Sequence, residues 1–119
     1  MDLNNQVVKL CVQGTQCEFA GEIEKAGQLY QQAWALAAND YEACIAAHYL
    51  AHLEKDARRK HQWNLTALEK AESAGNDEAR EFYPSLYVNL GESFELLGNE
   101  TEAKKYFDLA ESLGIRHQP

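Results

Sequence analysis

Large apolar side chains recur every three or four residues through most of the chain, which is the spacing of one helix face. The clearest run consists of Tyr87, Leu90, Phe94 and Leu97. Gly91 lies in the middle of that face. Because a glycine inside a helix costs about 1 kcal/mol in helix propensity, we expect a partner helix to approach Gly91 too closely for a Cβ atom. The pattern predicts an all-α chain.

The partner helix follows directly in the sequence. Small residues at Ala103 and Ala110 flank the large Phe107, so small gaps on one helix can receive bulky side chains from the other. Gly98 separates the two helices, and Gly114 is a typical helix stop. The segment from about residue 79 to residue 114 is therefore predicted to be a pair of packed helices.

The same order of small and large residues occurs 77 residues earlier in the chain. The earlier matching positions are Gly14, Gly21, Ala26, Tyr30, Ala33 and Leu36. We therefore predict a first helix pair over about residues 7–40, with helices near 6–20 and 22–38.

An offset of 77 residues is too long for two units of 34 residues, so the middle pair, over about residues 41–78, must be lengthened. Asp40 is a good cap for its first helix, and Asp56 is the best candidate for its turn. Pro84 removes a backbone donor and restricts the residue before it. We therefore expect the next helix, Asp77 to Leu97, to bend or to start again at Pro84.

Two local motifs connect these pairs to a known family. Tyr87, Leu90, Gly91 and Phe94 follow the W-x2-L-G-x2-Y pattern, and Ala103 with Phe107 follows A-x3-F. The chain resembles tetratricopeptide repeat (TPR) proteins, and its lengthened repeat is similar to those of kinesin light chains and bacterial peptide-sensing TPR regulators. The resemblance implies a single domain in which three helical hairpins stack into a right-handed α-α superhelix.

In TPR proteins the first helix of each hairpin lines a groove for a peptide or a partner helix, and the resemblance implies a non-catalytic protein-interaction module here. The groove residues expected by alignment are Cys11, Thr15, Glu18, Ile45, Tyr49, His52, Ser85, Asn89, Glu92 and Glu95. Their mixture favours a protein or peptide with Lys or Arg beside an apolar anchor, which would contact Tyr49. The alternative is that the acidic members are only solvated.

The chaperone-binding TPR domains hold a ligand carboxylate with lysine, arginine and asparagine. The corresponding positions here are Cys11, Thr15, Ala46, Ser85 and Asn89. None of them supplies a cation, and Glu92 nearby would repel a carboxylate. The sequence argues against that use.

Composition narrows the class of partner further. The 119 residues carry a formal net charge of −8, which disfavours nucleic acid and anionic lipid. The sequence has neither an apolar run long enough to span a membrane nor a signal-peptide pattern, so we expect a cytoplasmic protein. Three cysteines without C-x-x-C spacing predict reduced, mostly buried thiols.

Two clusters could carry other chemistry. His48 and His52 have a spacing that can bind metal, but a packed histidine at position 48 is the favoured interpretation. The basic residues Arg58, Arg59 and Lys60 could meet an acidic partner or phosphates, or could be a solvated turn near a helix end. The sequence contains no recognisable nucleophile–base pair, phosphate loop or paired catalytic carboxylates. We therefore expect neither an enzyme nor a cofactor.

Self-assembly is the competing hypothesis. TPR arrays usually end with an extra polar-faced helix, and none is predicted after residue 114. The apolar residues that would then be partly exposed are Tyr106, Leu109, Leu113 and Ile115. Such a face could form a homodimer.

Overall fold

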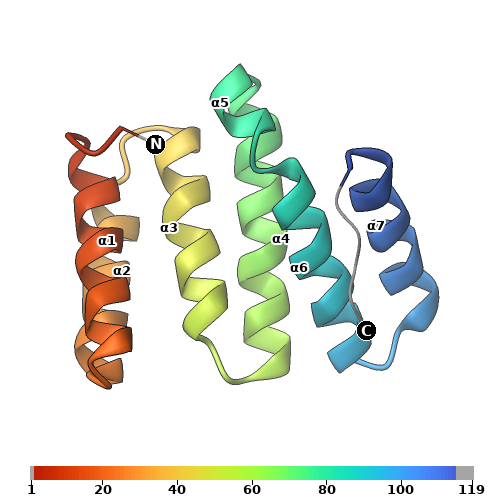
Figure 1. Cartoon of the computed structure of the whole chain (residues 1–119), viewed down its shortest axis with the longest axis horizontal. Coiled ribbons are helices and arrows are strands. Elements are labelled where there is room, and N and C mark those ends of the chain that lie inside the picture. Colours follow the sequence, from red (N-terminus) through yellow and green to blue (C-terminus); the bar gives the residue numbers. More distant parts are fainter. Residues whose placement is uncertain (1, 115–119) are drawn as a thin grey trace.

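The computed structural model describes residues 2–114, and within that range the chain forms seven helices and no strand (Figure 1). The helices are α1 (Gln6–Phe19), α2 (Ile23–Leu36), α3 (Asp40–Leu53), α4 (Ala57–Ala74), α5 (Asp77–Arg80), α6 (Tyr83–Leu96) and α7 (Glu100–Ser112). Helix α1 packs on α2, α3 on α4, and α6 on α7, and these pairs follow one another across the molecule. The predicted all-α class is confirmed.

One of the two predicted caps in the middle pair is confirmed. Asn39, not Asp40, caps α3, because its side chain accepts a hydrogen bond from the Glu42 N–H at 2.9 Å and Asp40 is already the first helical residue. Asp56 accepts a hydrogen bond from the Arg59 N–H at the start of α4, so the turn of the middle pair lies where the sequence placed it. Helix α5 ends at Arg80 and α6 begins at Tyr83, with Pro84 in its first turn. A proline costs little there because the first N–H groups of a helix have no partner within the helix. The predicted new helix start is confirmed.

Two glycines let the outer helix pairs approach closely. A Cβ atom added to Gly14 would lie 2.3 Å from Cε1 of Tyr30, and one added to Gly91 would lie 2.4 Å from Cε1 of Phe107. Both glycines are buried. The small residues opposite them are also buried, namely Ala26, Ala33, Ala103 and Ala110. The predicted packing of large rings into small gaps is therefore confirmed in both outer pairs.

The apolar side chains form two clusters that meet at the middle pair. One lies among α1, α2 and α3, and the other lies among α3, α4, α5 and α6. The rings of Trp34 in α2 and Trp63 in α4 pack edge to face, with their centroids 5.1 Å apart. Both rings border both clusters. This contact joins the first helix pair to the second.

Candidate functional site

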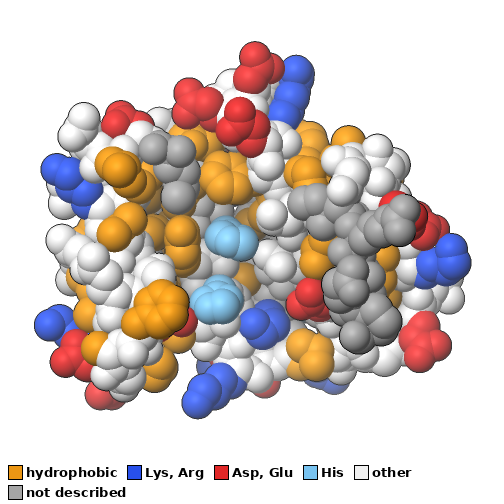
Figure 2. All heavy atoms as spheres, in the orientation of Figure 1, with side chains coloured by type: hydrophobic (Ala, Val, Ile, Leu, Met, Phe, Trp, Pro, Cys, Tyr) orange, Lys and Arg blue, Asp and Glu red, His pale blue; other side chains and the backbone are white. Residues whose placement is uncertain are grey.

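One candidate site is a pocket between the C-terminal halves of α1 and α3, called here the α1/α3 pocket. Its volume is about 430 Å³. It is lined by Thr15, Glu18, Phe19, His48, Tyr49 and His52. Figure 2 views this face, where imidazole side chains gather at the centre beside hydrophobic ones. Four of the six lining residues are among the predicted groove residues.

Glu18 is the charged centre of the α1/α3 pocket. The hydroxyl of Tyr30, which reaches across from α2, donates a hydrogen bond to Oε1 of Glu18. Nε2 of His52 lies 3.3 Å from Oε2 of the same carboxylate. Thr15 Oγ1 lies 3.3 Å from the Tyr30 hydroxyl and donates to the Cys11 carbonyl. Burial, and then the bond to Glu18, raises the pKa of Tyr30, so its hydroxyl remains a neutral donor.

Tyr49 and His48 form the aromatic wall on the α3 side. The Tyr49 ring centroid lies 5.3 Å from that of Tyr30 and 5.4 Å from that of His48. Nδ2 of Asn89 in α6 donates to Nδ1 of His48 at 3.3 Å. Burial, followed by the neighbouring His52, lowers the pKa of His48. His48 is therefore a neutral, half-buried histidine that links α3 to α6, in agreement with the favoured interpretation.

A second, smaller pocket adjoins the first, and we call it the α3/α6 pocket. Its volume is about 180 Å³. Its lining residues are His48, Ala51, His52, Lys60, Asn64, Asn89, Glu92, Ser93 and Leu96. His48 and His52 line both pockets, so the pockets adjoin across α1, α3 and α6, and we refer to the two together as the concavity. The predicted residues Asn89 and Glu92 therefore join the site, whereas Ser85 and Glu95 are exposed on α6 and line neither pocket.

Two expected groove residues do not face the groove. Cys11 is 0% exposed and Ile45 is 1% exposed, and both belong to the first apolar cluster. Helices α1 and α3 are in contact along their N-terminal halves there, so the concavity opens only towards their C-terminal ends. Burial raises the pKa of the Cys11 thiol to about 12, which keeps it protonated at neutral pH. Placing these two residues in the groove was wrong.

Lys60 has a structural partner at the end of α3. Its Nζ donates to the carbonyl oxygen of Ala51 at 2.7 Å and to that of His52 at 3.4 Å. A cation at a helix C-terminus stabilises the unpaired carbonyl groups and the negative end of the helix dipole. Arg58 and Arg59 are exposed. Of the basic cluster, Lys60 therefore helps to shape the site.

The predicted dimer face lies on the last pair. The Tyr106 ring is half-buried and stacks on Phe94, with ring centroids 5.6 Å apart. Leu109 is 37% exposed and Leu113 is 51% exposed. Ile115 lies outside the described residues. Two of the four residues thus present apolar surface to solvent.

A different concavity lies on the α2 side of the molecule, and we call it the α2 groove. It measures about 850 Å³. It is lined by Ile23, Glu24, Gly27, Gln28, Gln31, Gln32, Ala35, Leu50, Leu53, Glu54 and Lys55. Its volume is about twice that of the α1/α3 pocket, but no aromatic ring or imidazole lines it. The sequence analysis did not predict it.

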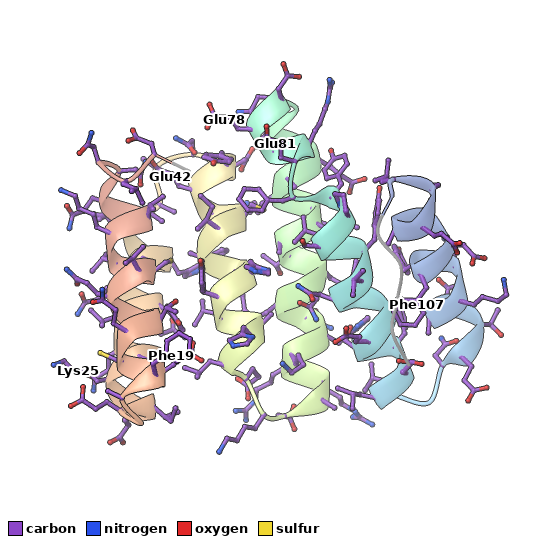
Figure 3. The ribbon with its side chains drawn as sticks, in the orientation of Figure 1. Phe19, Lys25, Glu42, Glu78, Glu81 and Phe107 are labelled. Atoms are coloured by element: carbon purple, nitrogen blue, oxygen red, sulfur yellow. The ribbon has the colours of Figure 1, made fainter. Side chains whose placement is uncertain are left out.

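Phe19 is the pocket residue that sequence reasoning missed most clearly. It is 91% exposed near the C-terminal end of α1, on the rim of the α1/α3 pocket (Figure 3). The repeat offset places it on Leu96, which lines the α3/α6 pocket. Two apolar residues at the equivalent ends of α1 and α6 were the available signal. Lys60 and Asn64 were also missed, because they reach the site from α4.

Two further findings concern residues 2–114 only. No group of three or more His, Cys, Asp or Glu side chains in that range is arranged to hold a metal ion. No helix in that range has both the length and the apolar character required to cross a membrane.

Comparisons of the chain with protein-family models, curated proteins and solved structures find no match.

Proposed function

We propose that this chain is a non-catalytic protein-interaction module, built as a TPR-like right-handed solenoid of three hairpins, that binds a peptide or a partner helix. The observation that carries the proposal is the pair of adjoining pockets across α1, α3 and α6. The resemblance of the helix pairs to TPR units supports the same use. An extended ligand that lies across these helices would contact both pockets.

The chemistry of the concavity supports a ligand with both apolar and polar groups. Phe19 and Tyr49 offer aromatic surface, and aromatic contacts commonly dominate protein interfaces. Asn89 and Glu92 offer polar groups on the α6 side. A segment with an apolar anchor and a basic residue complements this arrangement and the net charge of −8.

A random peptide library displayed on phage tests the proposal, because the natural partner is not needed. Peptides selected on the wild-type protein should lose binding to Phe19→Ser and Glu92→Lys. Both side chains are exposed, so these changes should leave the fold intact. Ile23→Ser is the matched control, because Ile23 is exposed in the α2 groove on another side of the molecule. Peptides that bind both variants but lose binding to Ile23→Ser would overturn the proposal and favour the α2 groove.

Self-association is a second candidate, favoured by the exposure of Leu109 and Leu113 on α7. Apolar surface at the end of a helical array commonly pairs with a second copy. Sedimentation velocity at micromolar concentrations tests this function. A dimer that dissociates in Leu109→Lys and Leu113→Lys supports it, and a monomer at every concentration removes it.

A further inference from the structure

The carboxylate of Glu18 can accept a further donor. Its Oε1 is held by Tyr30, and its Oε2 faces Nε2 of His52 at 3.3 Å. A carboxylate oxygen has two lone pairs, so one imidazole does not saturate Oε2. The His52 side chain is 66% exposed. The Glu18 side chain is 19% exposed, so the pair is open to solvent on the His52 side, and a ligand can displace the imidazole from there.

The surroundings of Glu18 favour a cation. The last turn of α1 contains no basic residue, so the negative end of its helix dipole adds to the charge of Glu18. Burial lowers the pKa of His48, and burial also raises the pKa of Tyr49, so both rings stay neutral. Lys60 is committed to the carbonyl groups at the end of α3 and lines the neighbouring pocket. Glu18 is therefore the charged group of the α1/α3 pocket, and the His52 imidazole beside it is displaceable.

The walls of the pocket favour a flat cation. Phe19 and Tyr49 line it together with Glu18, and Phe19 is almost fully exposed. A guanidinium group stacks on aromatic faces while its N–H groups bind a carboxylate, whereas an ammonium group is a compact point charge. The volume of about 430 Å³ lies within the range of small-ligand pockets.

We propose that the α1/α3 pocket binds an arginine side chain of the partner segment. The guanidinium donates to Oε2 of Glu18 in place of His52 and packs against the rings of Phe19 and Tyr49. His52 then acts as an internal competitor, because it pairs with the Glu18 carboxylate when no ligand is bound. This inference rests on the proposed function and specifies the ligand of the same site.

The test uses N-acetyl-arginine N-methylamide as the probe, titrated into ¹⁵N-labelled protein at neutral pH and low salt. Saturable chemical-shift changes should be centred on Thr15, Phe19 and His52. The citrulline analogue has the same shape without the charge and should bind about tenfold more weakly, or about 1.4 kcal/mol. The lysine analogue should also bind more weakly, because it cannot stack as a plane. Equal shifts with citrulline, or shifts centred elsewhere, would overturn the inference.

Three variants and one control sharpen the test. Glu18→Gln keeps an acceptor for the Tyr30 hydroxyl but loses the negative charge, so it should weaken arginine binding about fivefold. Glu24→Gln is the control: it removes one negative charge from α2 and should leave arginine binding unchanged. Phe19→Ser, at an exposed site, should weaken binding about threefold through the lost stacking. His52→Ala should strengthen binding, and a loss of affinity would refute its role as competitor. Unchanged affinity for the arginine probe in both Glu18→Gln and Phe19→Ser would overturn the inference, even if one of these variants folds poorly.

The two proposals fail separately. Phage-selected peptides that map to the concavity without arginine or lysine would refute the arginine pocket and leave the interaction module intact. Conversely, the arginine probe could bind as expected while no selected peptide maps to this face. That result would refute the proposed function and leave the pocket chemistry standing.

Discussion

Gly14 in the first helix pair and Gly91 in the last are equivalent positions, and each receives an aromatic ring from the facing helix. The rings end differently. Tyr30 carries a hydroxyl that reaches Glu18 on α1, whereas Phe107 ends in a carbon atom. Glu95 occupies the position equivalent to Glu18, yet it lies outside both pockets.

This difference separates packing from binding chemistry. In both pairs the contact between the glycine and the facing aromatic ring holds the two helices together, and this contact needs no polar atom. In the first pair the hydroxyl of Tyr30 also orients the Glu18 carboxylate in the α1/α3 pocket. A packing residue thus also positions a candidate binding residue, but only in the first pair.

The largest expected effect on stability comes from adding a Cβ atom at Gly14 or Gly91, the two glycine notches that receive the aromatic rings. Gly14→Ala should destabilise the protein by about 2 kcal/mol, because its Cβ would overlap the fully buried Tyr30 ring. Gly91→Ala should cost about half as much, because Phe107 is only partly buried and can shift. Urea unfolding followed by circular dichroism measures both.

Gly27→Ala is the control for both changes. Its Cβ would meet Cδ2 of Leu53 at 3.5 Å, an ordinary contact. The helix-propensity gain should then make it neutral or stabilising by up to about 1 kcal/mol. A Gly14→Ala variant as stable as Gly27→Ala would show that the first notch is not tight.

Removing the hydroxyl should have the next largest effect. Tyr30→Phe leaves the partly buried Glu18 carboxylate without that donor and should cost about 1–2 kcal/mol. A double-mutant cycle with Glu18→Gln, followed by urea unfolding, isolates the pair. A coupling energy near zero would contradict the role given to this bond.

Acid should weaken the middle pair, which lies between the two notches. The pKa values of His48 and His61 are both lowered from 6.5, each chiefly by burial. The unfolded chain therefore binds more protons than the folded one as the pH falls below 6.5. Stability is fully present above that pH and declines towards the folded-state pKa values.

Melting temperatures measured from about pH 7.5 down to about pH 5.5 follow this loss. Each kcal/mol lost from the free energy of unfolding should lower the melting temperature by roughly 4 °C in a domain of this size. His48→Gln can still accept from Asn89 and should flatten the pH dependence. The Gly14→Ala and Gly91→Ala variants should keep the wild-type slope, because neither touches a histidine. An unchanged slope in His48→Gln would exclude His48 as a source of the acid sensitivity.

The smallest expected effect is that of giving the last pair a hydroxyl. Phe107→Tyr should change the free energy of unfolding by no more than about 0.5 kcal/mol, since Phe107 is only partly buried. Urea unfolding alongside Tyr30→Phe gives the comparison. A cost well above 1 kcal/mol would mean that the two rings are not equivalent.

The sequence predicted the parts of the fold that depend on local sterics. The gaps at Gly14 and Gly91, the turn at Asp56 and the new helix start at Pro84 are all as expected, because glycine, aspartate and proline act on their own backbone or on the nearest helix. The burial of Cys11 agrees with the predicted mostly buried thiols, but the repeat alignment wrongly placed Cys11 in the groove. Its position depends on how closely α1 and α3 approach, which the spacing of residues along one helix does not reveal.

The candidate site was predicted only in part for a related reason. Thr15, Glu18, Tyr49 and His52 share one pocket as the repeat alignment suggested. The atoms that organise the pocket come from the second helices of the pairs, such as the Tyr30 hydroxyl. Such contacts depend on the length of one side chain and on the distance between helices, so they appear only when the helices are placed in space.

The edge-to-face pair of Trp34 and Trp63 has a practical consequence. These are the two tryptophans of the chain, and they touch where the first helix pair meets the second. The intrinsic fluorescence of the unlabelled protein therefore reports on this interface, since a separation of α2 from α4 would expose both indole rings to solvent. Any ligand that changes the angle between these two helix pairs should therefore change the tryptophan emission spectrum.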